Sequence, residues 1–211
     1  MYKTIIFDVD GTLINTEEAV LGSLQKMLRT DYNKEVELSE LSFVLGIPGS
    51  VSLPQLGIEN IDKANERWNY FMKDFYPSIH VFDEINNLLD TLNNKGLIQG
   101  IVTSKTTEEL NDDFVPFGLM KFLSYIVCAD DTKKHKPNPE PILKFLEISK
   151  TEPASSIYIG DTIYDFECAR DAGVDFGLAL WGCKDHEQIP AKYKFEKPSD
   201  LLHILSLPFP S

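Results

Sequence analysis

The sequence predicts an α/β fold in which a doubly wound parallel sheet carries a small, all-helical insertion. Five short apolar runs lack polar alternation, which suits strands buried on both faces, and helical patterns lie between most of them. The insertion is predicted because the chain between Asn15 and His80 shows helical periodicity and no convincing strand, and it is far too long for a simple crossover. The five expected strands are Lys3–Phe7, Ile98–Val102, Tyr125–Cys128, Ser156–Ile159 and Phe176–Leu180.

Boundary signals support the helices expected between these strands. Apolar residues at helical spacing run over residues 81–92. Thr106 and Glu109 have the spacing of a capping box just after the second expected strand. The tail from Lys184 to Ser211 is weakly patterned, and within it Asp200–Leu207 is expected to form a closing helix.

We place the insertion at residues 16–80 as a separate helical lobe, which leaves residues 1–15 and 81–211 as the α/β core. Two apolar stripes at helical spacing lie in the insertion, and both are interpreted as core packing. The loop between them, Gly46–Pro54, is rich in Gly, Pro and Ser. It is either a substrate-facing element or a plain connection between helices.

Composition restricts the possible partners. The 211 residues include 20 Lys and Arg against 33 Asp and Glu, a formal net charge of −13. Such a chain repels nucleic acid and anionic membranes, so neither is expected as a partner. No apolar run approaches the ~20 residues that span a bilayer, and no signal peptide precedes the first strand. We expect a cytoplasmic protein that is a monomer or a weak homodimer.

Acidic residues follow two of the expected strands. Asp8 and Asp10 end the first strand, where Gly11 turns the chain, and Asp161 and Asp165 follow the fourth. Because the carboxyl ends of parallel strands share one edge of the sheet, these carboxylates are expected to meet there. Like charges repel strongly in such a cleft, and Mg²⁺, which prefers oxygen ligands, would relieve the repulsion. The structural interpretations are an Asp-Gly turn, an N-cap at Asp161 and a solvated first-turn acid at Asp165, and the last two do not exclude a bound metal.

Groups that suit an anion follow the second and third expected strands. Thr103 and Ser104 offer a hydroxyl and main-chain N–H groups at a helix start, which suits a phosphate; an ordinary Ser/Thr cap is the alternative. Lys136 lies beside Pro137 and Pro139, which stiffen its backbone. A fixed ammonium near a carboxylate cluster can hold both a nucleophile and a phosphoryl group.

These elements, in this order and over about residues 3–180, resemble the haloacid dehalogenase superfamily. The resemblance implies a Rossmann-like sheet with strand order 5-4-1-2-3 and a helical cap after the first motif. The segments around Thr103 and Asp161 look most like those of phosphoglycolate phosphatases and related small-molecule phosphatases. The matching motifs are Asp8-x-Asp10-Gly11-Thr12-Leu13, Thr103, Lys136-Pro137-x-Pro139 and Gly160-Asp161-x-x-x-Asp165.

The resemblance also implies phosphoryl transfer through an aspartyl-phosphate. Asp8 would attack phosphorus, and Asp10 would protonate the leaving oxygen and later deprotonate the hydrolytic water. Thr103, the Ser104 amide and Lys136 would stabilise the phosphoryl oxygens. This agrees with the chemistry of the residues, because a carboxylate attacks an anion poorly until a cation and fixed donors neutralise it.

The metal implied by the resemblance is Mg²⁺. It would be held by the carboxylates of Asp8 and Asp161 and by the carbonyl of Asp10, with Asp165 bound directly or through water. The dehalogenases of the superfamily lack an acid at position 10 and need no Mg²⁺, so Asp10 makes dehalogenation improbable.

The expected partner is a small phosphorylated metabolite of the phosphoglycolate or sugar-phosphate class. Residues 16–80 hold 10 acidic and 6 basic residues, which favours a singly phosphorylated substrate, although one well-placed Lys63 or Arg67 outweighs that total. The alternatives are a sugar-phosphate mutase of the same family and a non-catalytic, receiver-like phosphate-binding domain.

Overall fold

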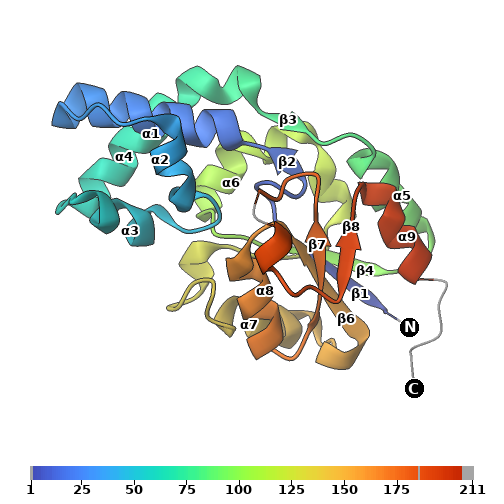
Figure 1. The fold of residues 1–211 in the computed structure, drawn as a ribbon. Helices are drawn as coiled ribbons and strands as arrows, with labels where there is room; N and C mark the ends of the chain where they lie inside the picture. Colours follow the sequence, from blue (N-terminus) through green and yellow to red (C-terminus); the bar gives the residue numbers. More distant parts are fainter. Residues whose placement is uncertain (1, 185, 206–211) are drawn as a thin grey trace.

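The structure, a computed structural model, describes residues 2–184 and 186–205. A six-stranded parallel sheet runs in the order β5-β4-β1-β6-β7-β8 (Figure 1). Its first five strands along the chain confirm the predicted order, and β8 adds an unpredicted edge strand beside β7. The strands are β1 Thr4–Phe7, β4 Ile98–Val102, β5 Tyr125–Val127, β6 Ser156–Gly160, β7 Asp175–Ala179 and β8 Tyr193–Phe195.

Helices cover both faces of the sheet, because the strands carry apolar side chains on both faces. Along β1, Ile5 and Phe7 join one buried cluster and Ile6 joins the other. Helices α5, α6 and α9 contribute to the first cluster, and α7 and α8 contribute to the second. These helices are α5 Ile85–Asn94, α6 Thr107–Asp113, α7 Glu140–Ser149, α8 Ile163–Asp171 and α9 Leu201–Ile204.

One predicted helix boundary is confirmed, and two predicted helices have other bounds in the structure. The capping box at α6 is confirmed, since Thr106 Oγ1 accepts from the Glu109 amide and the Glu109 carboxylate accepts from the Thr106 amide. The helix expected over residues 81–92 begins later, at Ile85, because residue 81 belongs to a short strand. The expected closing helix is α9, shorter than predicted, and residues 206 and 207 lie outside the described part of the chain.

The chain between the first two strands of the large sheet forms a group of helices with a buried apolar cluster of its own. Leu24 and Leu28 on α1 pack in this cluster with Phe71 on α4. In Figure 1 these helices lie to one side of the sheet. They are α1 Glu17–Tyr32, α2 Leu38–Leu41, α3 Gly49–Ser52 and α4 Ile61–Met72.

A two-stranded antiparallel ribbon connects this helical group to the sheet. It pairs β2 (Ile14–Asn15) with β3 (His80–Val81), so Asn15 and His80 lie in strands that the sequence did not indicate. Two-residue strands are too short to show a period, which explains the miss. The loop expected at Gly46–Pro54 is also partly helical, because α3 and a following 3₁₀ turn occupy residues 49–56. Within the described residues, no helix is both long enough and apolar enough to cross a bilayer.

Candidate active site

The two predicted acid pairs meet at the carboxyl ends of β1 and β6. These strands pair with Phe7 opposite Ile159, and the Asp8 amide donates to the Ile159 carbonyl at 2.8 Å. Asp8, Asp161 and Asp165 each present a carboxylate oxygen within 4.8 Å of the others. Two adjacent strands therefore bring together acids that are more than 150 residues apart in the chain.

The turn after β1 is closely packed against Asp161. Gly11 has φ +72°, and a Cβ there would lie 2.1 Å from Asp161 Oδ2, so a side chain is excluded on both counts. Thr12 Oγ1 donates to Asp161 Oδ1 at 3.1 Å. On the other side, Trp181 Nε1 donates to the Thr12 carbonyl at 2.9 Å, and a Cβ on Gly182 would lie 1.7 Å from the Gly11 carbonyl oxygen. Sequence reasoning missed Trp181 and Gly182, whose one signal is their position after β7.

Lys136 lies where the sequence placed it, beside the carboxylates. Its Nζ is 3.0 Å from Asp8 Oδ1 and 2.6 Å from Asp165 Oδ1, and it donates to the Tyr158 hydroxyl at 3.1 Å. Burial alone would lower the pKa of Lys136, but the neighbouring carboxylates of Asp165 and Asp8 outweigh it and hold the pKa above its usual range. The ammonium is therefore a permanent positive charge against Asp8.

Asp165 is completely buried, and its two oxygens already have donors. Oδ1 faces Lys136 and the Tyr158 hydroxyl, at 2.6 and 3.0 Å, and Oδ2 accepts from the Thr162 amide and hydroxyl at 3.0 and 2.6 Å. Thr162, rather than Asp161, is the N-cap of α8. The two structural alternatives considered for these acids, a cap at Asp161 and a solvated acid at Asp165, are therefore wrong.

Lys136 alone does not balance the three clustered carboxylates of Asp8, Asp161 and Asp165. Burial, opposed by Lys136 and reinforced by Asp165 and Asp10, raises the pKa of Asp8 to about 7. Burial and the charges of Asp165 and Asp8 hold the pKa of Asp161 well above its usual range. Asp8 Oδ1 lies at an ion-pair distance from Lys136, and this buried oxygen accepts no hydrogen bond from the described residues. A hard divalent cation such as Mg²⁺ fits this set of oxygen donors.

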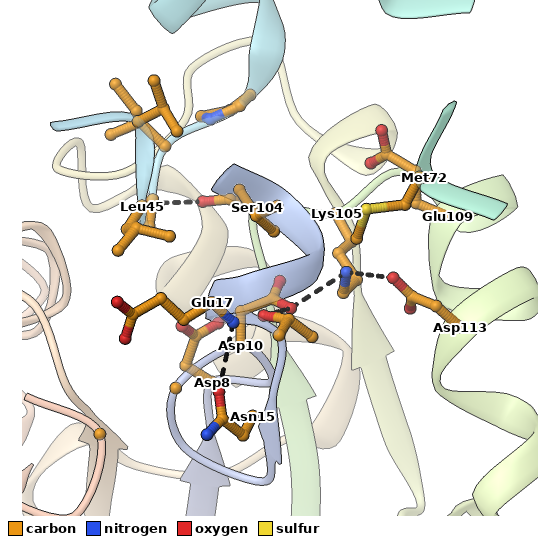
Figure 2. Close-up of a pocket in the computed structure, with 18 of the residues that line it drawn as sticks. Asp8, Asp10, Asn15, Glu17, Leu45, Met72, Ser104, Lys105, Glu109 and Asp113 are labelled. Atoms are coloured by element: carbon orange, nitrogen blue, oxygen red, sulfur yellow. Dashed lines mark hydrogen bonds and ion pairs between the residues drawn. The ribbon is translucent and has the colours of Figure 1, made fainter. Parts of the chain in front are cut away.

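Asp10 is held in a second charged network (Figure 2). Its Oδ1 accepts from Thr16 Oγ1 at 2.7 Å and lies 3.0 Å from Lys105 Nζ, which also pairs with Asp113 Oδ2 at 2.6 Å. Burial raises the pKa of Asp113 to about 6 although Lys105 opposes it. Sequence reasoning assigned no role to Lys105, whose signal was its place directly after Ser104, and nothing in the pattern of α6 indicated Asp113.

Thr103 and Ser104 follow β4, the other neighbour of β1. Thr103 is buried, and its Oγ1 accepts from the Lys105 amide at 3.2 Å. Ser104 Oγ reaches the helical insertion and donates to the Gly46 carbonyl at 3.0 Å. Gly46 has φ +82°, which glycine adopts without strain.

A cavity of about 380 Å³ opens above these residues. Asp8, Asp10 and Asp161 line one part of it, and residues 44–49 and α4 line another. Part of the Gly46–Pro54 segment thus faces the cavity, as one of the two interpretations of that segment expected. Lys63 and Arg67 are not among the described residues that line it; Arg67 pairs instead with Asp31 at 2.6 Å.

Comparison with known proteins agrees with this geometry. A profile of the family described as haloacid dehalogenase-like hydrolase matches residues 5–179. The pyrophosphatase PpaX of Anoxybacillus flavithermus is 28% identical over 209 residues, 97% of each chain. The crystal structure of a candidate phosphoglycolate phosphatase from Lactobacillus plantarum is 31% identical with a TM-score of 0.89, over 97% of this chain and 99% of that one. A haloacid dehalogenase-like hydrolase structure from Bacteroides fragilis, 20% identical over 95% of this chain and 100% of that one with a TM-score of 0.87, shares the fold.

The chain belongs to the haloacid dehalogenase-like hydrolase family, as its motifs predicted. Within that family it is a phosphatase-like hydrolase, with the parallel sheet and helical group that the resemblance implied.

Proposed function

We propose that this protein is a Mg²⁺-dependent phosphatase that hydrolyses a small phosphate monoester through an aspartyl-phosphate on Asp8. The observation that carries the proposal is the position of Asp8. Asp8 lines the cavity beside Asp161, and its Oδ1 lies 3.0 Å from Lys136 Nζ. The printed names of the relatives, a pyrophosphatase and a candidate phosphoglycolate phosphatase, support phosphoryl chemistry.

The metal would be held by the carboxylates of Asp8 and Asp161 and by the carbonyl of Asp10. When bound, it neutralises the carboxylates and the phosphate and so lets one anion approach another. Asp165 already accepts donors at both oxygens, which supports contact with the metal through water and a main role in holding Lys136.

The reaction proposed for the side chains has two halves. An Asp8 oxygen attacks phosphorus, the ester P–O bond breaks, and the Asp10 carboxyl gives its proton to the leaving oxygen. A water then loses a proton to Asp10 and attacks phosphorus, which releases Asp8 and inorganic phosphate. Lys136, the Thr103 hydroxyl and the Ser104 amide would stabilise the negative charge on the phosphoryl oxygens in both halves.

We assign residues 16–80 to a cap domain and residues 1–15 and 81–211 to the core. The separate apolar cluster of the helices, the β2–β3 ribbon and the hydrogen bond from Ser104 to Gly46 support this division. The partner would be a small phosphorylated metabolite, encountered in the cytoplasm by a monomer or a weak homodimer.

The experiment is an assay for inorganic phosphate with p-nitrophenyl phosphate and a panel of metabolite monoesters. We expect release that EDTA abolishes, that Mg²⁺ restores, and that Asp8→Asn lowers by at least about a thousandfold. Interconversion of sugar-phosphate isomers without phosphate release would identify a mutase instead. A stable phosphorylated protein after treatment with acetyl phosphate, with no turnover, would identify a receiver-like domain.

A further inference from the structure

The cavity wall beyond the phosphoryl end is strongly acidic. Apart from Asp8, Asp10 and Asp161, its carboxylates outnumber its two ammonium groups, Lys105 and Lys184. These carboxylates come from the start of α1 and from α6: Glu17, Glu108, Glu109, Asp112 and Asp113.

Both ammonium groups already have carboxylate partners. Lys105 lies between Asp10 and Asp113, at 3.0 and 2.6 Å, and is buried. Lys184 pairs with Glu17 at 2.5 Å. Among residues 2–184 and 186–205, therefore, both cations that line the cavity are paired: Lys105 in a buried network and Lys184 in an exposed ion pair.

Two carboxylates on the wall, in contrast, lack a cation. Glu108 and Asp112 lie one turn apart on α6, and neither forms an ion pair with a described residue. Among the described residues, the Asp112 carboxylate accepts one side-chain hydrogen bond, a long one of 3.5 Å from the Tyr76 hydroxyl. Both side chains are exposed, so water weakens their field, but an anionic group placed here would still meet repulsion, and α6 carries no cation of its own to offset it.

The rest of the wall is neutral. Asn65, Trp68, Asn69 and Met72 reach it from α4, and Phe82 follows β3. Amide groups and aromatic rings suit a hydroxylated or amine-bearing group, because amides bond to hydroxyls and ring faces attract cations.

We propose that the substrate is a phosphate monoester whose leaving group carries no second anionic group, being either a neutral, hydroxylated alcohol or an amino alcohol. This deepens the proposed function and rests on it. It favours the sugar-phosphate class over phosphoglycolate, whose carboxylate would face Glu108 and Asp112, and over pyrophosphate, although relatives of this chain carry those substrates in their names.

The test compares three two-carbon monoesters that differ in one charge: 2-hydroxyethyl phosphate, O-phosphoethanolamine and phosphoglycolate. Pyrophosphate and p-nitrophenyl phosphate complete the set. We expect kcat/KM for the hydroxyl and ammonium esters to exceed that for phosphoglycolate and for pyrophosphate by about tenfold or more, because one unfavourable charge contact is of that order.

Equal or better turnover of phosphoglycolate or pyrophosphate would overturn the inference, and it would point to main-chain N–H groups of the 45–49 segment as the anion site. If p-nitrophenyl phosphate is hydrolysed in that case, the proposed function survives. If no ester is hydrolysed, including p-nitrophenyl phosphate, the proposed function and this inference fail together.

A variant tests the cause of the preference. Glu108→Gln combined with Asp112→Asn removes both charges and keeps both shapes. We expect the ratio of kcat/KM for phosphoglycolate to that for 2-hydroxyethyl phosphate to rise by about five- to tenfold. Glu66→Gln, an exposed carboxylate on α4 that does not line the cavity, should leave the ratio unchanged. An unchanged ratio in the double variant would contradict the inference.

Discussion

Lys105 Nζ lies 3.0 Å from Asp10 Oδ1, so the second aspartate of the first motif is held by a buried cation from the end of another strand. The same oxygen accepts from Thr16 at 2.7 Å, and Asp113 fixes the far side of the ammonium. Asp10 is thus held by Thr16, which precedes α1, and by Lys105, which precedes α6. In the proposed mechanism this fixes the group that transfers a proton to the leaving oxygen, which makes Lys105 a positioning residue.

Lys105→Met should impair the proton transfer more than the attack on phosphorus. An alkyl leaving group needs its proton, whereas p-nitrophenolate departs without one. We therefore expect kcat to fall by about 10- to 100-fold for alkyl monoesters and by much less for p-nitrophenyl phosphate. Steady-state kinetics on a series of leaving groups measures this.

Asp113→Asn is the matched control for that variant, because it keeps an oxygen near Lys105 and leaves the ammonium on Asp10. Its kcat should lie between those of the wild type and of Lys105→Met. An equal loss on alkyl and p-nitrophenyl esters in Lys105→Met would show that Lys105 does not act through Asp10.

The metal-free protein should become less stable as the pH rises from about 4 to about 7. The pKa of Asp8 is raised by burial from 3.8 to about 7, so in this window the native state keeps a proton that the unfolded chain has lost. The free energy of unfolding then falls with rising pH, by at most about 1.4 kcal/mol per pH unit for this proton. Asp113, with its pKa raised to about 6, adds a change of the same sign.

Thermal unfolding in EDTA at pH 5.5 and pH 7.5 measures this effect. Asp8→Asn should reduce the slope of this dependence, because Asp8 no longer contributes while Asp113 still does. Mg²⁺ should raise the Tm of the wild type at pH 7.5 and raise that of the variant much less. The same pH slope in both proteins would rule out Asp8 as its source.

Ser104→Ala should weaken the link between the core and the helical insertion. The variant loses the 3.0 Å hydrogen bond to the Gly46 carbonyl but keeps the Ser104 amide. One such bond contributes about 1 kcal/mol, so we expect kcat/KM to fall by about fivefold. The fall in kcat/KM for metabolite esters that reach the 45–49 segment should be larger than the loss of affinity for inorganic phosphate, measured as a competitive inhibitor. Equal losses for both would place the effect at the phosphoryl end instead.

Gly182→Ala should damage the site although Gly182 has no side chain that could take part in the reaction. The new Cβ would lie 1.7 Å from the Gly11 carbonyl oxygen, so the turn that packs on Asp161 has to move. We expect the half-saturating Mg²⁺ concentration to rise and kcat to fall at least about tenfold. Gly118→Ala, at φ +72° with nothing within 4 Å of its Cβ, should cost about 1 kcal/mol of stability and spare the kinetics. Normal Mg²⁺ dependence in Gly182→Ala would contradict this assignment.

The parts of this molecule that could be predicted are those marked by a pattern within a short stretch of sequence. Buried strands such as β1 are unbroken apolar runs, and Asp8 and Asp161 directly follow two of them, so their meeting could be inferred from the parallel sheet. The edge strand β8 and the β2–β3 ribbon have only two or three residues each and carry no readable period.

Other parts depended on contacts between distant segments. Lys105 and Asp113 each look like surface charges in the sequence, and only folding brings them together with Asp10 in a buried network. Gly182 likewise matters because it packs on Gly11, 171 positions earlier in the chain. The charges of residues 16–80 said little about the substrate, because Lys63 and Arg67 do not line the cavity, whereas Glu108 and Asp112 of the core do.

The most direct test of the account is to trap the phosphoryl group on the protein during turnover. Acid quenching within the first turnovers, followed by intact-mass and peptide analysis, should find one phosphoryl group on Asp8, and borohydride reduction should convert that residue to homoserine. Asp8→Asn should show neither product. A phosphoryl group on another residue, or full turnover with no phosphorylated protein at any time after mixing, would contradict the account.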